Sequence, residues 1–76
     1  MILYLGGQFS FYLHGHPPQV ELELKEPARL SDILARLGVP VEEIGLAVIN
    51  DELVDPQAAF VSQQDVVKLY PPVSGG

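Results

Sequence analysis

The chain has 76 residues and a net charge of −6 at pH 7, because ten Asp and Glu outnumber four Lys and Arg, and it contains no cysteine. A chain of this length forms one small domain, in which folding buries only about 60% of the surface that the unfolded chain exposes. The absence of cysteine excludes disulfides, thiolate metal sites and a cysteine nucleophile. With few cations, no long apolar run and no signal-peptide pattern, we expect a cytoplasmic protein that binds neither nucleic acid nor membrane.

Two strands are predicted in the first third of the chain. Residues 1–5 form an apolar run without charge, which is typical of a strand buried on both faces, and Gly-Gly follows it as a turn. Residues 8–13 fit either a short strand or one turn of helix, and residues 14–18 form a loop that contains two prolines. Residues 20–24 alternate apolar and acidic side chains, which predicts a strand with one face on the core and the other in water.

An amphipathic helix is predicted next. Four apolar side chains repeat at the i, i+3, i+4, i+7 spacing of one helical stripe: Leu30, Ile33, Leu34 and Leu37. Gly38 is expected to end the helix as a left-handed cap, and Pro40 prevents its continuation. A helix of about three turns is too short to be stable alone, so it must pack on a sheet.

A β-hairpin is predicted over residues 46–54. Its two apolar strands flank Asn50 and Asp51, which tolerate the positive φ of a tight turn. The segment after the hairpin is expected to place one core residue beneath the sheet, and Phe60 is the predicted residue. Residues 62–65 then turn the chain into its last strand.

The final eleven residues combine a strand with a bare tail. Residues 66–70 are β-branched and aromatic, whereas Pro71 and Pro72 lack the N–H donors that would continue a strand. The first and last strands are the most apolar, which predicts that they are neighbours at the centre of the sheet, where a crossover that contains the helix would allow a parallel pair. We therefore expect one domain over residues 1–70 and an exposed, flexible tail over residues 71–76.

One helix across a mixed sheet of four to five strands is an α+β arrangement. With the ending Gly75-Gly76, this order resembles the β-grasp fold of ubiquitin and, more closely, the MoaD/ThiS family of bacterial sulfur carriers. The last residues carry the resemblance, because Asp65 opens a strand, Tyr70 precedes Pro-Pro, and Ser74 precedes Gly-Gly. Weaker similarity extends over the start of the helix and the hairpin turn.

The Pro-Pro pair resembles the small subunit of molybdopterin synthase more than the carrier of thiazole synthesis. The sequence also departs from the family pattern: Asn50-Asp51 stands where the family often has Asn-Gly, and Gln63-Gln64 where it often has Asp-Gly. Residues 6–18 match no signature of the family. A carrier for a different pathway therefore remains open.

The resemblance implies that a partner enzyme of the MoeB/ThiF type adenylates the carboxylate of Gly76 with ATP. A sulfur donor then displaces AMP and leaves a thiocarboxylate, and the further partner is a synthase large subunit of the MoaE type or a thiazole synthase, while the sulfur acceptor is left open. Gly75 and Gly76 have no side chains, so this end of the chain can thread a narrow tunnel, and the prolines hold its base extended. The resemblance implies no cofactor or metal bound by the chain itself, and a monomer when it is alone.

The predicted site is the tail and its root. Gly75 and Gly76 form the reactive end, and six residues are expected to bind partners: Leu69, Tyr70, Pro71, Pro72, Val73 and Ser74. Leu69 and Tyr70 are included because a partner that takes in the tail must also cover its root. No acid, base and nucleophile constellation is visible, so we expect a carrier subunit without catalytic residues of its own. The alternatives are a carrier for thiamine thiazole or tRNA thiolation, a ubiquitin-like modifier of lysines, and a non-catalytic β-grasp interaction domain.

Overall fold

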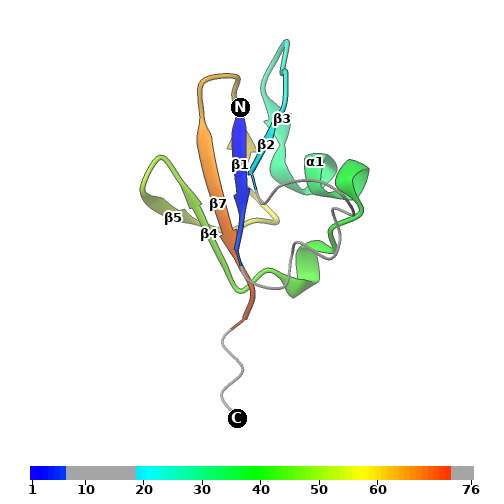
Figure 1. Ribbon diagram of the computed structural model, residues 1–76, viewed down its shortest axis with the longest axis vertical. Helices are drawn as coiled ribbons and strands as arrows, with labels where there is room; N and C mark the ends of the chain where they lie inside the picture. Colours follow the sequence, from blue (N-terminus) through cyan, green and yellow to red (C-terminus); the bar gives the residue numbers. More distant parts are fainter. Residues whose placement is uncertain (7–18, 73–76) are drawn as a thin grey trace.

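The computed structural model describes residues 1–6 and 19–72, in which one helix packs against one face of a β-sheet (Figure 1). The described elements are β1 (Ile2–Leu5), β2 (Gln19–Glu21), β3 (Ala28–Arg29), α1 (Leu30–Leu37), the 3₁₀ turn η2 (Val41–Glu43), β4 (Leu46–Ile49), β5 (Glu52–Val54), β6 (Phe60–Val61) and β7 (Val66–Tyr70). Five strands form a sheet in the order β2-β1-β7-β4-β5, while β3 and β6 form a separate two-stranded ribbon. The predicted α+β class, with a mixed sheet and one main helix, is confirmed and is consistent with a β-grasp fold.

The first and last strands are neighbours at the centre of the sheet, as predicted, and they run parallel. Strands β1 and β7 pair in register from Ile2 with Val66 to Leu5 with Leu69, and β2 and β4 add antiparallel strands on either side. Parallel strands need a long crossover between them. The segment that carries α1 provides this crossover and lies over one face of the sheet (Figure 1).

The core lies between this face of the sheet and α1. The largest fully buried side chains come from β1, α1, β6 and β7: Leu3, Leu30, Leu34, Val61, Val67 and Leu69. Tyr4, between the buried Leu3 and Leu5, is 38% exposed. The prediction that the first strand is buried on both faces is therefore wrong. The strand is central, yet every second side chain points to the face that α1 does not cover.

Phe60 is not a core residue, which corrects the prediction. Its side chain is 59% exposed, whereas that of Val61 is fully buried. Both residues lie in β6, which pairs antiparallel with Ala28 and Arg29 of β3. Because side chains alternate along a strand, β6 buries Val61 and turns Phe60 outward. There the Arg29 guanidinium lies 5.3 Å from the centroid of the Phe60 ring, within reach of a cation–π interaction.

The alternating segment over residues 20–24 forms a strand only in its first part. Strand β2 ends at Glu21, which pairs with Ile2, and the next backbone N–H, that of Leu22, donates to the carbonyl of Met1 at 2.8 Å. Beyond this point the segment passes the start of β1 and has no strand to pair with. Leu22 and Leu24 still pack against the core. In this segment the alternation of apolar and acidic residues therefore indicates which side chains are buried, and not that the backbone pairs in the sheet.

Helix α1 follows the predicted apolar stripe. Leu30, Ile33 and Leu34 are buried, and Gly38 has a φ of 77° and donates its N–H to the carbonyl of Ala35 at 3.2 Å. This is the predicted left-handed cap. In the part of the chain that the structure describes, no helix is long and apolar enough to cross a membrane.

The predicted turn at Asn50 and Asp51 joins β4 to β5. Both residues have positive φ, 51° and 69°, as a two-residue hairpin turn requires. The Asn50 side chain also reaches β7: its Nδ2 donates to Oδ1 of Asp65 at 2.9 Å, and its Oδ1 accepts the N–H of Val66 at 3.0 Å. The second oxygen of Asp65 accepts the N–H of Ser62 at 2.8 Å. Asp65, which precedes the last strand, therefore links the turn between β4 and β5 to the turn before β7 through these hydrogen bonds.

Replacing Asp51 with glycine is expected to stabilise the fold. A residue with a Cβ at positive φ is strained by roughly 1–2 kcal/mol, and the entropy that glycine adds to the unfolded chain offsets part of this gain. We expect the free energy of unfolding to rise by a few tenths to about 1 kcal/mol, measured by urea denaturation. Asp51→Ala keeps the strain and should show no gain. A lower urea midpoint for Asp51→Gly would contradict the strain argument.

Candidate functional site at the root of the tail

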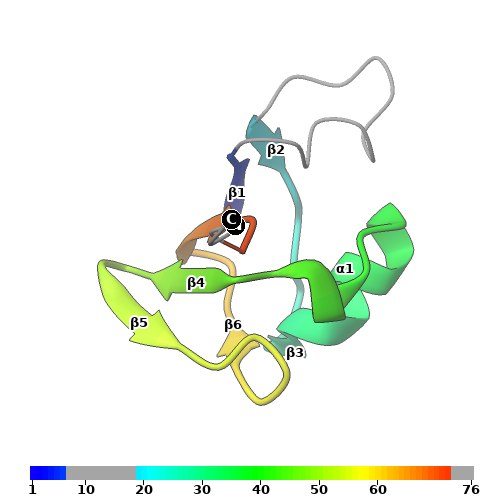
Figure 2. The ribbon, with the colours of Figure 1, turned by 90° about the horizontal axis from the view of Figure 1, so that it is seen from below.

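The structure describes half of the predicted site residues. Leu69 and Tyr70 end β7, and Pro71 and Pro72 follow it at the end of the molecule that faces the viewer in Figure 2. The other four predicted residues lie outside the described residues: Val73, Ser74, Gly75 and Gly76. The described part of the site is therefore its root, the point at which the chain leaves the sheet.

Leu69 and Tyr70 play different parts. Leu69 is fully buried, because it faces α1 together with Val67. Its side chain is therefore not available to a partner, and it belongs to the core and not to the expected docking surface. Tyr70, the next residue, points to the opposite face and is 41% exposed. Because side chains alternate along a strand, a buried core leucine and an accessible aromatic side chain are neighbours in the sequence.

Gly45 holds the root of the tail and is not among the site residues predicted from the sequence. Its N–H donates to the carbonyl of Tyr70 at 2.9 Å. A Cβ on Gly45 would lie 2.4 Å from Cα and 2.6 Å from N of Pro72, and 2.9 Å from the carbonyl carbon of Pro71. These are backbone atoms, which cannot rotate away as a side chain can. Only glycine therefore lets Pro71 and Pro72 lie in this position.

Gly6 contacts the root from the other side. Its N–H donates to the carbonyl of Leu69 at 2.9 Å, and a Cβ here would lie 2.9 Å from Cδ1 of the Tyr70 ring. The ring is a side chain, so this contact is less strict than that of Gly45. Strands β1 and β4 border β7, and each has a glycine next to one end: Gly6 follows β1 and Gly45 precedes β4. This position beside a strand is the signal in the sequence that could have identified both residues.

An apolar surface adjoins the root. Leu46 and Tyr70 are paired across β4 and β7, and their side chains are 42% and 41% exposed. In residues 1–6 and 19–72, no group of three or more His, Asp or Glu side chains gathers in a way that would hold a metal ion. The described geometry thus fixes the start of the tail beside an apolar surface.

Comparison with known protein families gives a match over most of the chain. A family model described as the ThiS family matches residues 8–76. The matched region contains α1, the strands from β2 to β7 and the final Gly-Gly. A search of curated proteins found no match.

Proposed function

The chain belongs to the ThiS family of ubiquitin-like sulfur carriers, which have the β-grasp fold, and from this premise we propose that it donates sulfur in molybdopterin synthesis through a thiocarboxylate on Gly76. The observation that carries the proposal is that the family match extends through the terminal Gly-Gly. The molybdopterin pathway is favoured by Pro71-Pro72 before a small-residue tail, which resembles the small subunit of molybdopterin synthase.

The chemistry requires activation of the carboxylate, which is a poor electrophile until one of its oxygens becomes part of a leaving group. In the proposed reaction a Gly76 oxygen attacks the α-phosphorus of ATP, pyrophosphate leaves, and an acyl adenylate forms. Sulfur at the sulfide level, written here as hydrosulfide, then attacks the acyl carbon, AMP leaves with that oxygen, and loss of the S–H proton gives the thiocarboxylate. The chain is the substrate, and an adenylating partner of the MoeB/ThiF type supplies ATP and the catalytic groups.

The root geometry supports this role. Gly45 and the two prolines restrict the backbone at the point where the tail begins. A restricted root loses less conformational entropy when a partner takes in the residues beyond it. Tyr70 and Leu46, exposed beside the root, offer apolar contact area to the same partner.

Intact mass spectrometry tests the proposal. After incubation with its adenylating partner, ATP and a sulfur donor, the chain should gain the mass expected for exchange of one oxygen for sulfur. A chain that lacks Gly76, and a reaction without ATP, should show no gain. Absence of the gain in the complete reaction would overturn the carrier role, and ladders of lysine conjugates that need Gly76 would favour a modifier.

The pathway needs a second measurement. In the presence of a molybdopterin synthase large subunit, the thiocarboxylated chain should transfer its sulfur to the precursor, form molybdopterin and return to the carboxylate. Transfer to a thiazole synthase alone would keep the carrier role and move it to thiamine synthesis.

A further inference from the structure

A cleft of about 520 Å³ lies at the edge of the sheet, between β5 and the connection from β5 to β6. Val54 packs against the core, so Glu52, two residues before it on β5, faces the same side of the sheet. Helix α1 lies opposite the middle of the sheet and does not cover β5 (Figure 2). We call this hollow the edge cleft, and six of its lining residues matter here: Ile49, Glu52, Val54, Asp55, Ala59 and Phe60.

The edge cleft has an apolar floor and a fixed wall. Ile49, Val54 and Ala59 form the floor, and all three pack against the core. The wall is a tight turn at Asp55, whose carbonyl accepts the N–H groups of Ala58 at 3.1 Å and Ala59 at 3.0 Å. Backbone hydrogen bonds therefore hold the cleft open before any ligand arrives, as is usual for binding sites.

The charge in the edge cleft is negative and unpaired. Among the described residues that line it, Glu52 and Asp55 are acidic and none is a cation. The Asp55 carboxylate accepts the N–H of Gln57 at 2.9 Å. Within residues 1–6 and 19–72, neither carboxylate has an ion pair, and the Glu52 side chain has no hydrogen bond.

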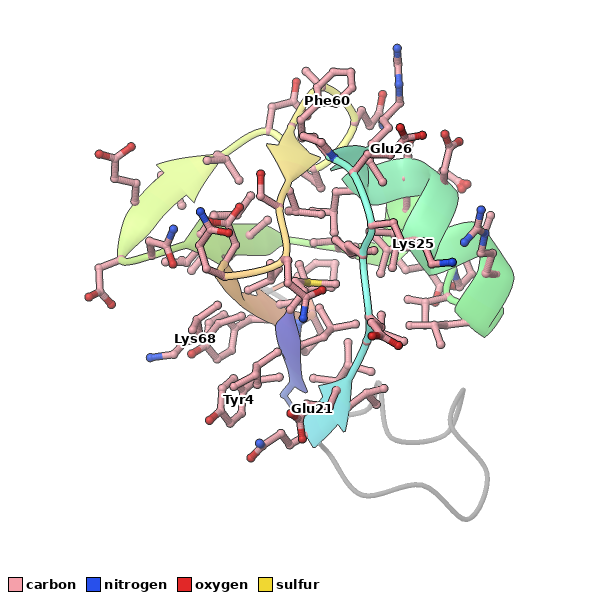
Figure 3. All side chains as sticks on the ribbon, turned by 90° about the horizontal axis from the view of Figure 1, so that it is seen from above. Tyr4, Glu21, Lys25, Glu26, Phe60 and Lys68 are labelled. Carbon is pink, nitrogen blue, oxygen red and sulfur yellow. The ribbon has the colours of Figure 1, made fainter. Side chains whose placement is uncertain are left out.

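The two cations nearest in the fold do not fill the cleft. Arg29 lies over the Phe60 ring at 5.3 Å from its centroid, outside the cleft lining. Lys68 lies on the opposite face of the sheet, where it lines a different cavity together with Asp51. Figure 3 shows Phe60 and Lys68 projecting from the molecule in different directions. The cation that would complement Glu52 and Asp55 must therefore come from another molecule.

The lining selects an arginine side chain. Its aliphatic stem can lie on the apolar floor while its charged end meets the carboxylates. The planar guanidinium also stacks on an aromatic ring and donates several hydrogen bonds to carboxylates, which a lysine ammonium does less well. Phe60 offers such a ring, because its side chain is 59% exposed. The volume of the cleft leaves room for apolar neighbours of the arginine.

We propose that the edge cleft binds a short segment of a partner protein, in which an arginine flanked by apolar residues lies between Phe60 and the carboxylates of Glu52 and Asp55. A second copy of the chain fits poorly, because both copies carry a net charge of −6. The root residues Gly45, Tyr70, Pro71 and Pro72 are not among the lining residues. The cleft is thus a binding site separate from the tail and independent of the proposed sulfur chemistry.

Titration of the full chain with a short capped peptide of alanine and leucine around one arginine tests the proposal. The amide resonances of Glu52, Asp55 and Phe60 should shift, and a peptide with norleucine in place of arginine should bind roughly tenfold more weakly. We expect Glu52→Gln to weaken binding of the arginine peptide by roughly 3- to 10-fold. Glu42→Gln removes the same charge from η2, outside the cleft, and should weaken binding by less than about twofold. Thermal melts verify that both variants are folded.

Four results would overturn the proposal. The first is the absence of shifts in the cleft at millimolar peptide, and the second is equal affinity for the norleucine peptide. The third is equal weakening by Glu52→Gln and Glu42→Gln, which would show only a general attraction to an acidic chain. The fourth is a set of shifts in the cleft that appear with protein concentration alone, which would assign the cleft to a second copy. The titration needs neither ATP nor a sulfur donor, so failure of the carrier role would not alter its result.

Discussion

Replacing Gly45 with alanine is expected to lower kcat/KM for adenylation of the chain by roughly 10- to 100-fold, because a displacement of about 1 Å in a reacting group has effects of this size. The added Cβ would lie 2.4 Å from the Cα of Pro72, so the root of the tail must move. Pro71 and Pro72 follow the last strand and do not belong to the core. The fold is therefore expected to survive the substitution, and the loss should appear in the reaction rather than in stability.

Pyrophosphate exchange with the adenylating partner measures this effect, and a thermal melt verifies folding. Gly6→Ala is the graded comparison, because its Cβ meets the Tyr70 ring, which can rotate, rather than backbone. We expect a smaller loss for Gly6→Ala than for Gly45→Ala. Unchanged kcat/KM for Gly45→Ala would show that the position of the root does not matter to the partner.

Leu69→Ala is expected to lower the free energy of unfolding by about 2–5 kcal/mol, the range for truncating a buried leucine. Leu69 is fully buried between the sheet and α1, and small domains have only about 5–15 kcal/mol of stability in total. The variant should therefore unfold at a much lower urea concentration than the wild-type chain. An unchanged urea midpoint would contradict the core position of Leu69.

Tyr70→Ala is the matched comparison, one residue further along the same strand. Its ring is 41% exposed, so its truncation should change stability by less than about 1–2 kcal/mol, although it removes exposed apolar area beside the root of the tail. We expect weaker partner binding with a near-normal melt. The two variants together separate a structural residue from a docking residue at the root of the tail.

Local patterns in the sequence predict much of this fold because their causes are local. The apolar stripe and Gly38 predict α1 and its cap, since helix periodicity and left-handed capping depend on a few neighbouring residues. Asn50-Asp51 predicts the hairpin turn for the same reason. The Gly-Gly ending and the preceding prolines also indicate the family, which the match over residues 8–76 confirms.

The remaining features depend on which strands become neighbours, and no local pattern records that. The ribbon of β3 and β6 forms between segments far apart in the chain, and this pairing turns Phe60 outward and Val61 inward. In an apolar run such as residues 66–70, burial depends on the face that α1 covers, so only the packed structure distinguishes Leu69 from Tyr70. Gly45 becomes important because the tertiary fold brings Pro72 against it.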